Sequence, residues 1–322
     1  MLLSCGDALI DFIPQKTQDN DDAFRPLIGG SCLNVAVTMA RLGAPAGFLG
    51  ALSDDFLGDM IADHASASGV SLDRTSRLPL PATTAFVKLA TGEPQYVFYD
   101  SGTAARNWQY VSGAIIFSEV EAIHFGSTTL VHDDLAARTF SVLQEAKGLS
   151  TISFDPNCRP GLVQDRKRYL ITIENFARSS DIVKMSGTDF EFLYGHRDYE
   201  QKASQLFSSG VTIFFVTRGG KSTIAYHRSG AFAEVKVRKI QERDTIGAGD
   251  TFQGALLVAL NENGRLGPAG SLDLSEWDLE KLTRFASDCA GLTCERVGAD
   301  PPRKHELPQS WWSAVNLSAG AL

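Results

Sequence analysis

The chain alternates short apolar segments with longer amphipathic ones, and this alternation limits its fold more than any other feature of the sequence. Short apolar runs predict buried strands, whereas apolar residues that recur at three and four positions predict helices. Strand and helix alternate in this way at 46–52 and 55–69, 122–127 and 133–148, 151–156 and 166–180, and 181–186 and 188–195. We therefore predict an α/β fold with a doubly wound, mostly parallel sheet, whose ligands bind in the loops that follow the strands.

Two stretches interrupt the alternation and predict a second, smaller sheet. Residues 12–30 carry a polar and acidic loop directly after the first apolar strand, 2–11. Residues 83–102 predict two strands joined by a turn at 91–94. Strands that leave an α/β core often form a lid over the ends of its strands. We predict a single domain over the whole chain, 1–322, with a small β-sheet lid formed by about 12–27 and 84–105.

Charge and composition exclude several classes of function. The chain has 30 Lys and Arg against 38 Asp and Glu, a net charge of −8, which argues against a nucleic-acid or membrane partner. No apolar run approaches the ~20 residues that span a bilayer, and the acidic Asp7 and Asp11 do not fit a signal peptide. The five cysteines form no CxxC pair, which is typical of reduced thiols. We therefore expect a cytoplasmic protein.

Residues 243–260, RDTIGAGDTFQGALLVAL, place three very small residues directly before an apolar helical pattern. The backbone N–H groups of Gly247, Ala248 and Gly249 can approach a ligand closely, and a helix N-terminus favours an anion. Asp250 puts a carboxylate at the same place. It is either a plain helix cap or a base that accepts a proton as an anionic group is transferred.

Four stretches of the sequence resemble a known family. Residues 29–61 and 244–257 resemble the two signatures of the PfkB carbohydrate kinases, the ribokinase-like family, and FDPNCRP (154–160) and FYDSGTAAR (98–106) are most similar to its fructokinase branch. The resemblance implies ATP-dependent phosphorylation of a sugar hydroxymethyl group, with Mg²⁺ and often a stimulating K⁺. It also implies a ribokinase-like fold whose β-sheet lid closes on the sugar, and a homodimer built through that lid.

The resemblance also implies roles for particular residues. Asp250 is the catalytic base, and the amides of Gly247, Ala248 and Gly249 stabilise the migrating phosphoryl group. The predicted substrate-binding residues are Asp11, Gly29, Gly30, Asn34, Tyr99, Arg106 and Arg159. Taken singly, Asp11 would be read as a solvent-facing strand end and Asn34 as a helix cap, and it is the family resemblance that gives both a role in binding the substrate. Arg159 follows a strand end and contacts either ligand or solvent, while Tyr99 and Arg106 either line the sugar pocket or only pack.

The nucleotide site is expected on several further segments. The predicted ATP-binding residues are Ser186, Thr217, Gly219, Gly247, Gly249 and Ser287. Asp189 stands where the family usually has Glu, and it is predicted to bind Mg²⁺ through water. The sequence departs from the family pattern at Ser222, in place of a glycine, and at Ser287, where Asn is common. The backbone near Asp244, Ile246, Arg296 and Gly298 is where the family binds a monovalent cation.

Three functions are compatible with these residues. The first is a fructokinase, and the second is a kinase for 2-keto-3-deoxygluconate or for another ketose or pentose, as in ribokinase. The third is an inactive relative that binds sugar or nucleotide. The presence of Asp250 with Gly247 and Gly249 speaks against the third, since an inactive site does not need its base. A sugar acid would require a cation for its carboxylate, which Arg159 or Arg106 could supply.

Overall fold

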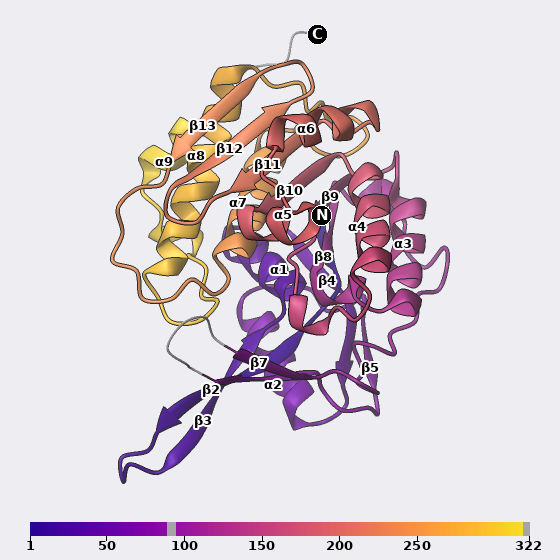
Figure 1. Ribbon diagram of the computed structural model, residues 1–322, viewed down its shortest axis with the longest axis vertical. Helices are drawn as coiled ribbons and strands as arrows, with labels where there is room; N and C mark the ends of the chain where they lie inside the picture. Colours follow the sequence, from indigo (N-terminus) through magenta and orange to yellow (C-terminus); the bar gives the residue numbers. More distant parts are fainter. Residues whose placement is uncertain (89–94, 318–322) are drawn as a thin grey trace.

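The computed structural model describes residues 1–88 and 95–317, and its centre is a large twisted sheet (Figure 1). In spatial order its strands are β13 (Phe232–Lys236), β12 (Ser222–His227), β11 (Ile213–Thr217), β10 (Ile182–Ser186), β9 (Thr151–Asp155), β8 (Ala122–Gly126), β1 (Leu2–Cys5), β4 (Ala46–Ser53) and β5 (Thr75–Leu78). In this sheet the neighbouring strands from β11 to β5 are parallel, and the pairs β11–β12 and β12–β13 are antiparallel.

Helices cover both faces of this sheet, which confirms the doubly wound α/β fold. One face carries α1 (Ser31–Arg41), α2 (Phe56–Ala67), α7 (Ala248–Glu262), α8 (Glu276–Cys294) and α9 (Gln309–Ala314). The other carries α3 (Asp133–Ala146), α4 (Arg166–Arg178), α5 (Gly187–Tyr194) and α6 (Tyr199–Ser208). Short 3₁₀ turns lie at Phe117–Glu119, Ser127–Leu130, Pro160–Leu162 and Lys304–Glu306. Among the described helices none is both long and apolar enough to cross a membrane.

Helix α7 lies against α1 at very close range, and this contact positions the start of α7. From Asp250 to Leu260 every residue of α7 is buried, as the apolar pattern of the sequence predicts. A Cβ atom built on Gly254 would lie 2.6 Å from Cβ of Thr38 in α1, so the two backbones approach as closely as only glycine allows. The first turns of α1 and α7 therefore meet beside the carboxyl ends of the central strands.

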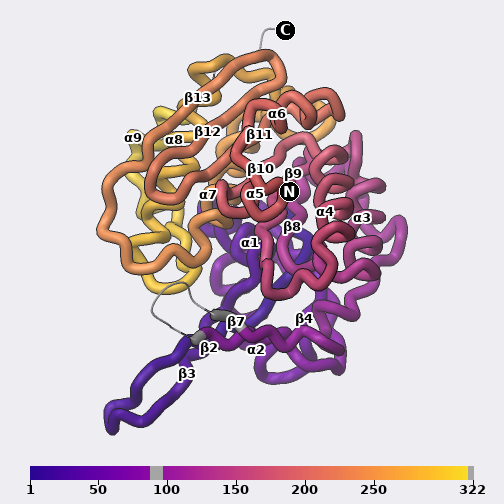
Figure 2. The backbone as a smooth tube through the Cα atoms, in the orientation of Figure 1, coloured from indigo at the N-terminus to yellow at the C-terminus, as the bar shows by residue number. Residues whose placement is uncertain are grey.

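A separate small sheet confirms the second sheet that the sequence predicts. Its order is β3 (Asp22–Gly29), β2 (Leu9–Lys16), β6 (Thr84–Lys88) and β7 (Gln95–Tyr99). The β2–β3 hairpin projects away from the body of the molecule (Figure 2). Most of 12–30 is thus strand, and the acidic loop is confined to 17–21 between β2 and β3. The predicted turn at 91–94 lies outside the described residues.

The predicted first strand, 2–11, is in fact two strands in different sheets, β1 and β2. A Cβ atom on Gly6 would lie 2.4 Å from Sγ of Cys32, so the chain passes close to α1 here. The carboxylate of Asp7 then accepts hydrogen bonds from the backbone N–H of Cys32 at 3.0 Å and from Oγ of Ser127 at 2.7 Å. These contacts with distant segments bend the chain out of the large sheet, and local periodicity carries no sign of them.

Candidate active site

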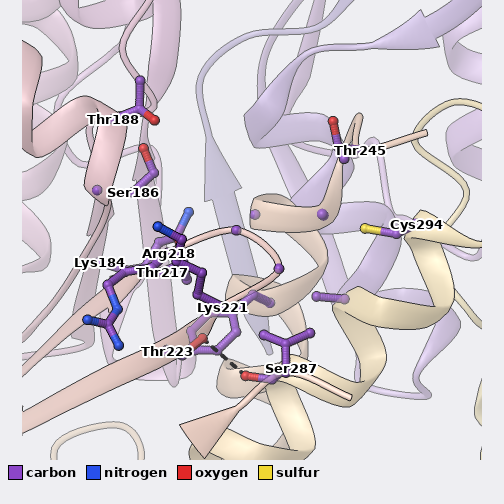
Figure 3. A pocket seen from close by; sticks show the side chains of 18 of the residues that line it. Lys184, Ser186, Thr188, Thr217, Arg218, Lys221, Thr223, Thr245, Ser287 and Cys294 are labelled. Atoms are coloured by element: carbon purple, nitrogen blue, oxygen red, sulfur yellow. Dashed lines mark hydrogen bonds between the residues drawn. The ribbon is translucent and has the colours of Figure 1, made fainter. Parts of the chain in front are cut away.

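A cavity of about 720 Å³ lies beyond the carboxyl ends of β10 and β11, between the start of α7 and the end of α8 (Figure 3). The predicted ATP-binding residues on its wall are Ser186, Thr217, Gly219, Gly249 and Ser287. Gly247 is not part of the wall, although its neighbour Ala248 is. Oγ of Ser287 donates to Oγ1 of Thr223 at 3.2 Å, drawn as a dashed line in Figure 3. The structure therefore gathers most of the predicted nucleotide residues around one cavity.

The start of α7 forms one end of this cavity. Gly247 precedes the helix with φ 77°, and a Cβ atom there would lie 2.6 Å from Cβ of Ala299. Glycine is required at this position for both reasons. No side chain among the described residues caps α7, and Ala248 and Gly249 face the cavity. The backbone N–H of Ala248 donates weakly to the carbonyl oxygen of Thr245 at 3.3 Å, whereas that of Gly249 has no partner in the described part of the chain and can bind a ligand.

Asp250 lies in the first turn of α7 but does not cap it. Its side chain is buried, and its carboxylate accepts hydrogen bonds from Oγ of Ser31 at 2.6 Å and from Nδ2 of Asn34 at 2.8 Å. Nδ2 of Asn157 is 3.5 Å away. Burial raises the pKa of Asp250, opposed by these hydrogen bonds from α1 and by nearby positive charges. Asp250 is therefore not a helix cap, and its carboxylate is held in one place by α1.

Asp11 lies on β2, where glycine leaves room for its carboxylate. A Cβ atom on Gly29 would lie 2.4 Å from Oδ2 of Asp11, and one on Gly30, where φ is 100°, would lie 2.7 Å from the carbonyl oxygen of Asp7. Within residues 1–88 and 95–317, the side chain of Asp11 has no hydrogen-bond partner, although its backbone pairs in the small sheet. Burial raises the pKa of Asp11 to about 6, while Arg159 opposes that shift. An unpaired, half-buried carboxylate of this kind can accept hydrogen bonds from sugar hydroxyls.

The other predicted substrate residues differ in how they are placed. Arg159 lies on the cavity wall and donates to the carbonyl oxygens of Asn157 and Cys158 in its own loop. Nη1 of Arg106 lies 3.1 Å from Nε2 of His132. Among the described residues, Arg106 makes no hydrogen bond or ion pair with Asp250. Tyr99 is 60% exposed on β7 and packs edge-on against Phe86.

Asp189 lies where its carboxylate could hold a metal ion together with the phosphates of a nucleotide. It closes a capping box with Ser186 at the start of α5, and its Oδ1 accepts from the backbone N–H of Cys158 at 3.0 Å. Ser186 and Asp189 both line the cavity. No cluster of three or more metal-ligating side chains occurs within the described part of the chain. Mg²⁺ is commonly held by one or two carboxylates together with substrate phosphates, and the carboxylate of Asp189 at this wall fits that arrangement.

The predicted monovalent-cation residues form one loop cluster beside α7. Oδ1 of Asp244 accepts from the backbone N–H of Ile246 at 3.0 Å, and Oδ2 accepts from that of Gly298 at 2.8 Å. Arg296 points its guanidinium group to Glu306 instead, at 2.8 Å. The carboxylate of Asp244 thus ties the loop before α7 to the loop after α8.

Sequence reasoning did not identify Ser31, Asn157, Lys184 and Asp155 as site residues. Nζ of Lys184 donates to Oδ2 of Asp155 at 2.7 Å, and both side chains are almost fully buried. A lysine inside an apolar strand is a signal that was available, because buried lysines are nearly always paired. The position of Ser31, three residues before Asn34 on the same face of α1, was a second such signal.

Residues 1–306 match the family described as pfkB family carbohydrate kinase. The chain belongs to the PfkB family. It is 31% identical to a fructokinase of Rhizobium leguminosarum bv. trifolii, over 96% of this chain and 91% of the relative, and 32% identical to fructokinase-1 of Oryza sativa subsp. japonica, over 95% of each. A crystal structure of fructokinase from Xylella fastidiosa with bound ATP is similar at 27% identity and TM-score 0.83, covering 98% of this chain and 97% of that one. This PfkB protein is therefore a phosphotransferase that acts on a sugar hydroxyl.

Proposed function

We propose that the protein is a fructokinase, which transfers the γ-phosphoryl group of ATP to a hydroxymethyl group of D-fructose. The observation that carries the proposal is the buried carboxylate of Asp250 beside the uncapped amides of α7, at the end of the nucleotide cavity. The choice of sugar is supported by similar proteins that are named fructokinase and that match this chain over nearly their whole length.

Each site residue has its own role in the proposed reaction. Asp250 accepts the proton of the attacking hydroxyl, and burial, which raises its pKa, makes the carboxylate a stronger base. The first-turn amides at Ala248 and Gly249 stabilise the oxygens that gain charge. Asp189 would hold Mg²⁺ through water, and the metal neutralises charge on the phosphates. Asn34 and Ser31 keep the carboxylate of Asp250 in place.

The arginines near the site favour a neutral ketose over a sugar acid. Arg159 is engaged by carbonyl oxygens of its own loop, and Arg106 is held by His132 with Asp100 nearby. Asp11, in contrast, is an unpaired carboxylate, which repels another carboxylate and accepts hydroxyl hydrogens. Fructose has a hydroxyl at C3 that 2-keto-3-deoxygluconate lacks. The site therefore suits fructose better than the acid.

We further propose that the small sheet is a lid and that two copies join through it. The side chains of Phe24 and Val97 on this sheet are 52% and 55% exposed. Exposed apolar patches often mark a surface that binds another protein. The loop around Asp244 and Gly298 is the proposed site for K⁺. Sedimentation of the parent protein and of Phe24→Asp would separate a dimer from a monomer.

A coupled assay of ADP release over fructose, ribose, glucose, 2-keto-3-deoxygluconate and nucleosides tests the proposed function. We expect fructose to give the highest kcat/KM. A better ribose or sugar-acid substrate would overturn the choice of sugar, and no turnover with any acceptor would support an inactive relative.

A further inference from the structure

Lys184 is a buried cation on the wall of the nucleotide cavity. It belongs to β10, its side chain is 2% exposed, and Figure 3 labels it among the lining residues. Lysine is almost never buried this far without a partner, because moving an ammonium ion out of water is costly. Neither the fold nor the roles assigned above explain why a lysine stands here.

The surroundings of Lys184 are strongly negative. Its Nζ donates to Oδ2 of Asp155 at 2.7 Å, and the charges of Asp189 and Asp250 also act on it. Burial acts to lower the pKa of Lys184, but these three carboxylates outweigh burial and raise it. Lys184 is therefore an ammonium ion at neutral pH, held where β9, β10 and α7 meet.

The ammonium group also reaches the anion-binding turn. A Cβ atom built on Gly249 would lie 2.8 Å from Nζ of Lys184. An ammonium group has three N–H donors, and across 1–88 and 95–317 Asp155 is its only hydrogen-bond acceptor. Two donors are therefore left for a ligand. The lysine and the first-turn amides of α7 present their donors at the same corner of the cavity.

A purely structural role does not account for this arrangement. A buried ion pair adds little net stability, because the attraction is offset by the desolvation of both charges. Three other cations on the cavity wall are engaged elsewhere, since Arg218 pairs with Glu234, Arg197 pairs with Glu191 and Arg159 binds carbonyl oxygens of its own loop. The remaining cation, Lys221, is exposed and, unlike Lys184, is not held by a buried carboxylate among the described residues. A triphosphate brings several negative charges to this corner, and Lys184 has free donors there.

We propose that Lys184 is a further catalytic residue, whose ammonium group binds the γ-phosphoryl group during transfer while Asp155 fixes its position. The inference rests on the kinase activity proposed above. In that reaction the sugar oxygen bonds to the γ-phosphorus and the bond to the β–γ bridging oxygen breaks. ADP leaves with the electron pair, and Asp250 takes the hydroxyl proton. Lys184 keeps its own proton and stabilises the charge on the equatorial oxygens.

Lys184→Met tests the proposal through two nucleotides that differ in the γ-phosphoryl group. The β,γ-imido analogue of ATP has this group and ADP lacks it. We expect the variant to lose at least ~10-fold in affinity for the analogue, by titration calorimetry with Mg²⁺, and less than ~3-fold for ADP. Its kcat with fructose should fall ~10²–10³-fold, the usual effect of removing one preorganised donor.

Lys202→Met is the matched control. Lys202 is 5% exposed and pairs with Glu174, but it lies on α6 and does not line the cavity. Its loss should lower Tm without changing either nucleotide affinity. Lys184→Arg keeps the charge and should retain part of the preference for the analogue. Lys184→Met leaves the buried carboxylate of Asp155 without its partner, which can prevent folding. In that case the double variant D155N/K184M, which has no carboxylate at position 155, takes its place in the same measurements.

Equal loss of both affinities on removing Lys184, or a kcat within ~3-fold of the parent, would overturn the assignment. The proposed function fails on a different result. A parent protein that binds the imido analogue through Lys184 yet phosphorylates no sugar would refute the fructokinase proposal and leave the binding role of the lysine intact.

Discussion

Asp11 and Asp250 are both carboxylates whose pKa is raised by burial, but their contacts give them different roles. Asp250 is held by Ser31 and Asn34 and is fixed in place before any ligand binds. The carboxylate of Asp11 is influenced by the opposing charges of Arg159 and Asp7, and it has no hydrogen-bond partner among the described residues. A positioned carboxylate suits a base, and an unpaired one suits a ligand that brings its own donors.

The role of Asp250 predicts a large effect on turnover with little effect on binding. In Asp250→Asn the amide can still accept from Ser31 but cannot take up a proton. We expect kcat to fall at least ~10²-fold while fructose and ATP affinities change little. Steady-state kinetics and calorimetry measure both, with Tm as the check on folding. A variant that turns over within a few-fold of the parent would show that Asp250 is structural.

The environment of Asp11 predicts a pH-dependent affinity for the sugar. Its pKa is about 6, and only the charged form accepts hydrogen bonds from two hydroxyls. Fructose affinity should therefore be constant above pH 7 and fall by up to about tenfold for each pH unit below 6. In Asp11→Asn, fructose affinity measured by calorimetry between pH 5 and 8 should show no such fall. An unchanged pH profile in the variant would remove Asp11 from the sugar site.

The raised pKa of Asp11 also makes the folding stability of the protein depend on pH. The folded-state pKa of Asp11 is above the ordinary value near ~4, so the charge disfavours the folded state at pH above 6, and this cost disappears below pH ~4. Asp11→Asn should accordingly raise Tm at pH 8 and change it little at pH 4. Equal shifts at both pH values, or a lower Tm at pH 8, would contradict the raised pKa.

At the scale of elements, the start of α7 depends on a backbone shape that only glycine adopts without cost. Gly247 has φ 77° and faces Ala299, while Gly264 just beyond the other end of the helix has φ 63° and open space around its Cβ position. Both positions therefore carry the same conformational penalty for alanine, but only the first adds a steric clash.

Gly247→Ala should be more harmful than Gly264→Ala. We expect roughly 1 kcal/mol of destabilisation for the second from the left-handed backbone alone, and a further ~1–3 kcal/mol for the first from the clash. Because the clash also displaces the first-turn amides, only Gly247→Ala should lower kcat strongly. Urea unfolding and steady-state assays measure these effects. Equal losses in both variants would mean that the turn does not bind the phosphoryl group.

The elements differ in how far the sequence predicted them. The alternation of β9, α4, β10 and α5 is local, and periodicity reports it directly. The break between β1 and β2 depends on Cys32 and Ser127, which are distant in the sequence, so no local pattern shows it. The lysine at 184 was a local signal that was overlooked, but its partner Asp155 lies 29 residues away, and no local pattern shows the pairing. The glycine-led turn before Asp250 was found, because glycine and helix periodicity there are both local signals.

At the scale of the whole molecule, the small sheet touches the loop that borders the start of α7. A Cβ atom on Gly298 would lie 3.2 Å from Cδ1 of Leu27 in β3, and Gly298 is bound through its N–H to Asp244. The projecting β2–β3 hairpin and the remainder of the small sheet lie at one end of the molecule (Figure 1). A movement of this sheet would therefore reach the phosphoryl-binding turn.

The proposed lid predicts slower hydrogen exchange when sugar binds. Amides in 12–27, 84–88 and 95–99 should be protected at saturating fructose, because a closed lid excludes water. Those of β13, at the far edge of the large sheet, should not change. Unchanged exchange in the small sheet at saturating fructose would indicate a fixed hairpin.

The central claim, that this site phosphorylates fructose, is tested most directly by comparing kcat/KM for fructose with that for 2-keto-3-deoxygluconate in the parent and in Asp11→Ala. A buried polar group that pairs with a hydroxyl rejects an analogue lacking it by ~10⁴-fold or more. The parent should prefer fructose by orders of magnitude, and Asp11→Ala should lose most of that preference. A parent that prefers the sugar acid, with Arg159→Ala abolishing its use, would contradict the fructokinase assignment.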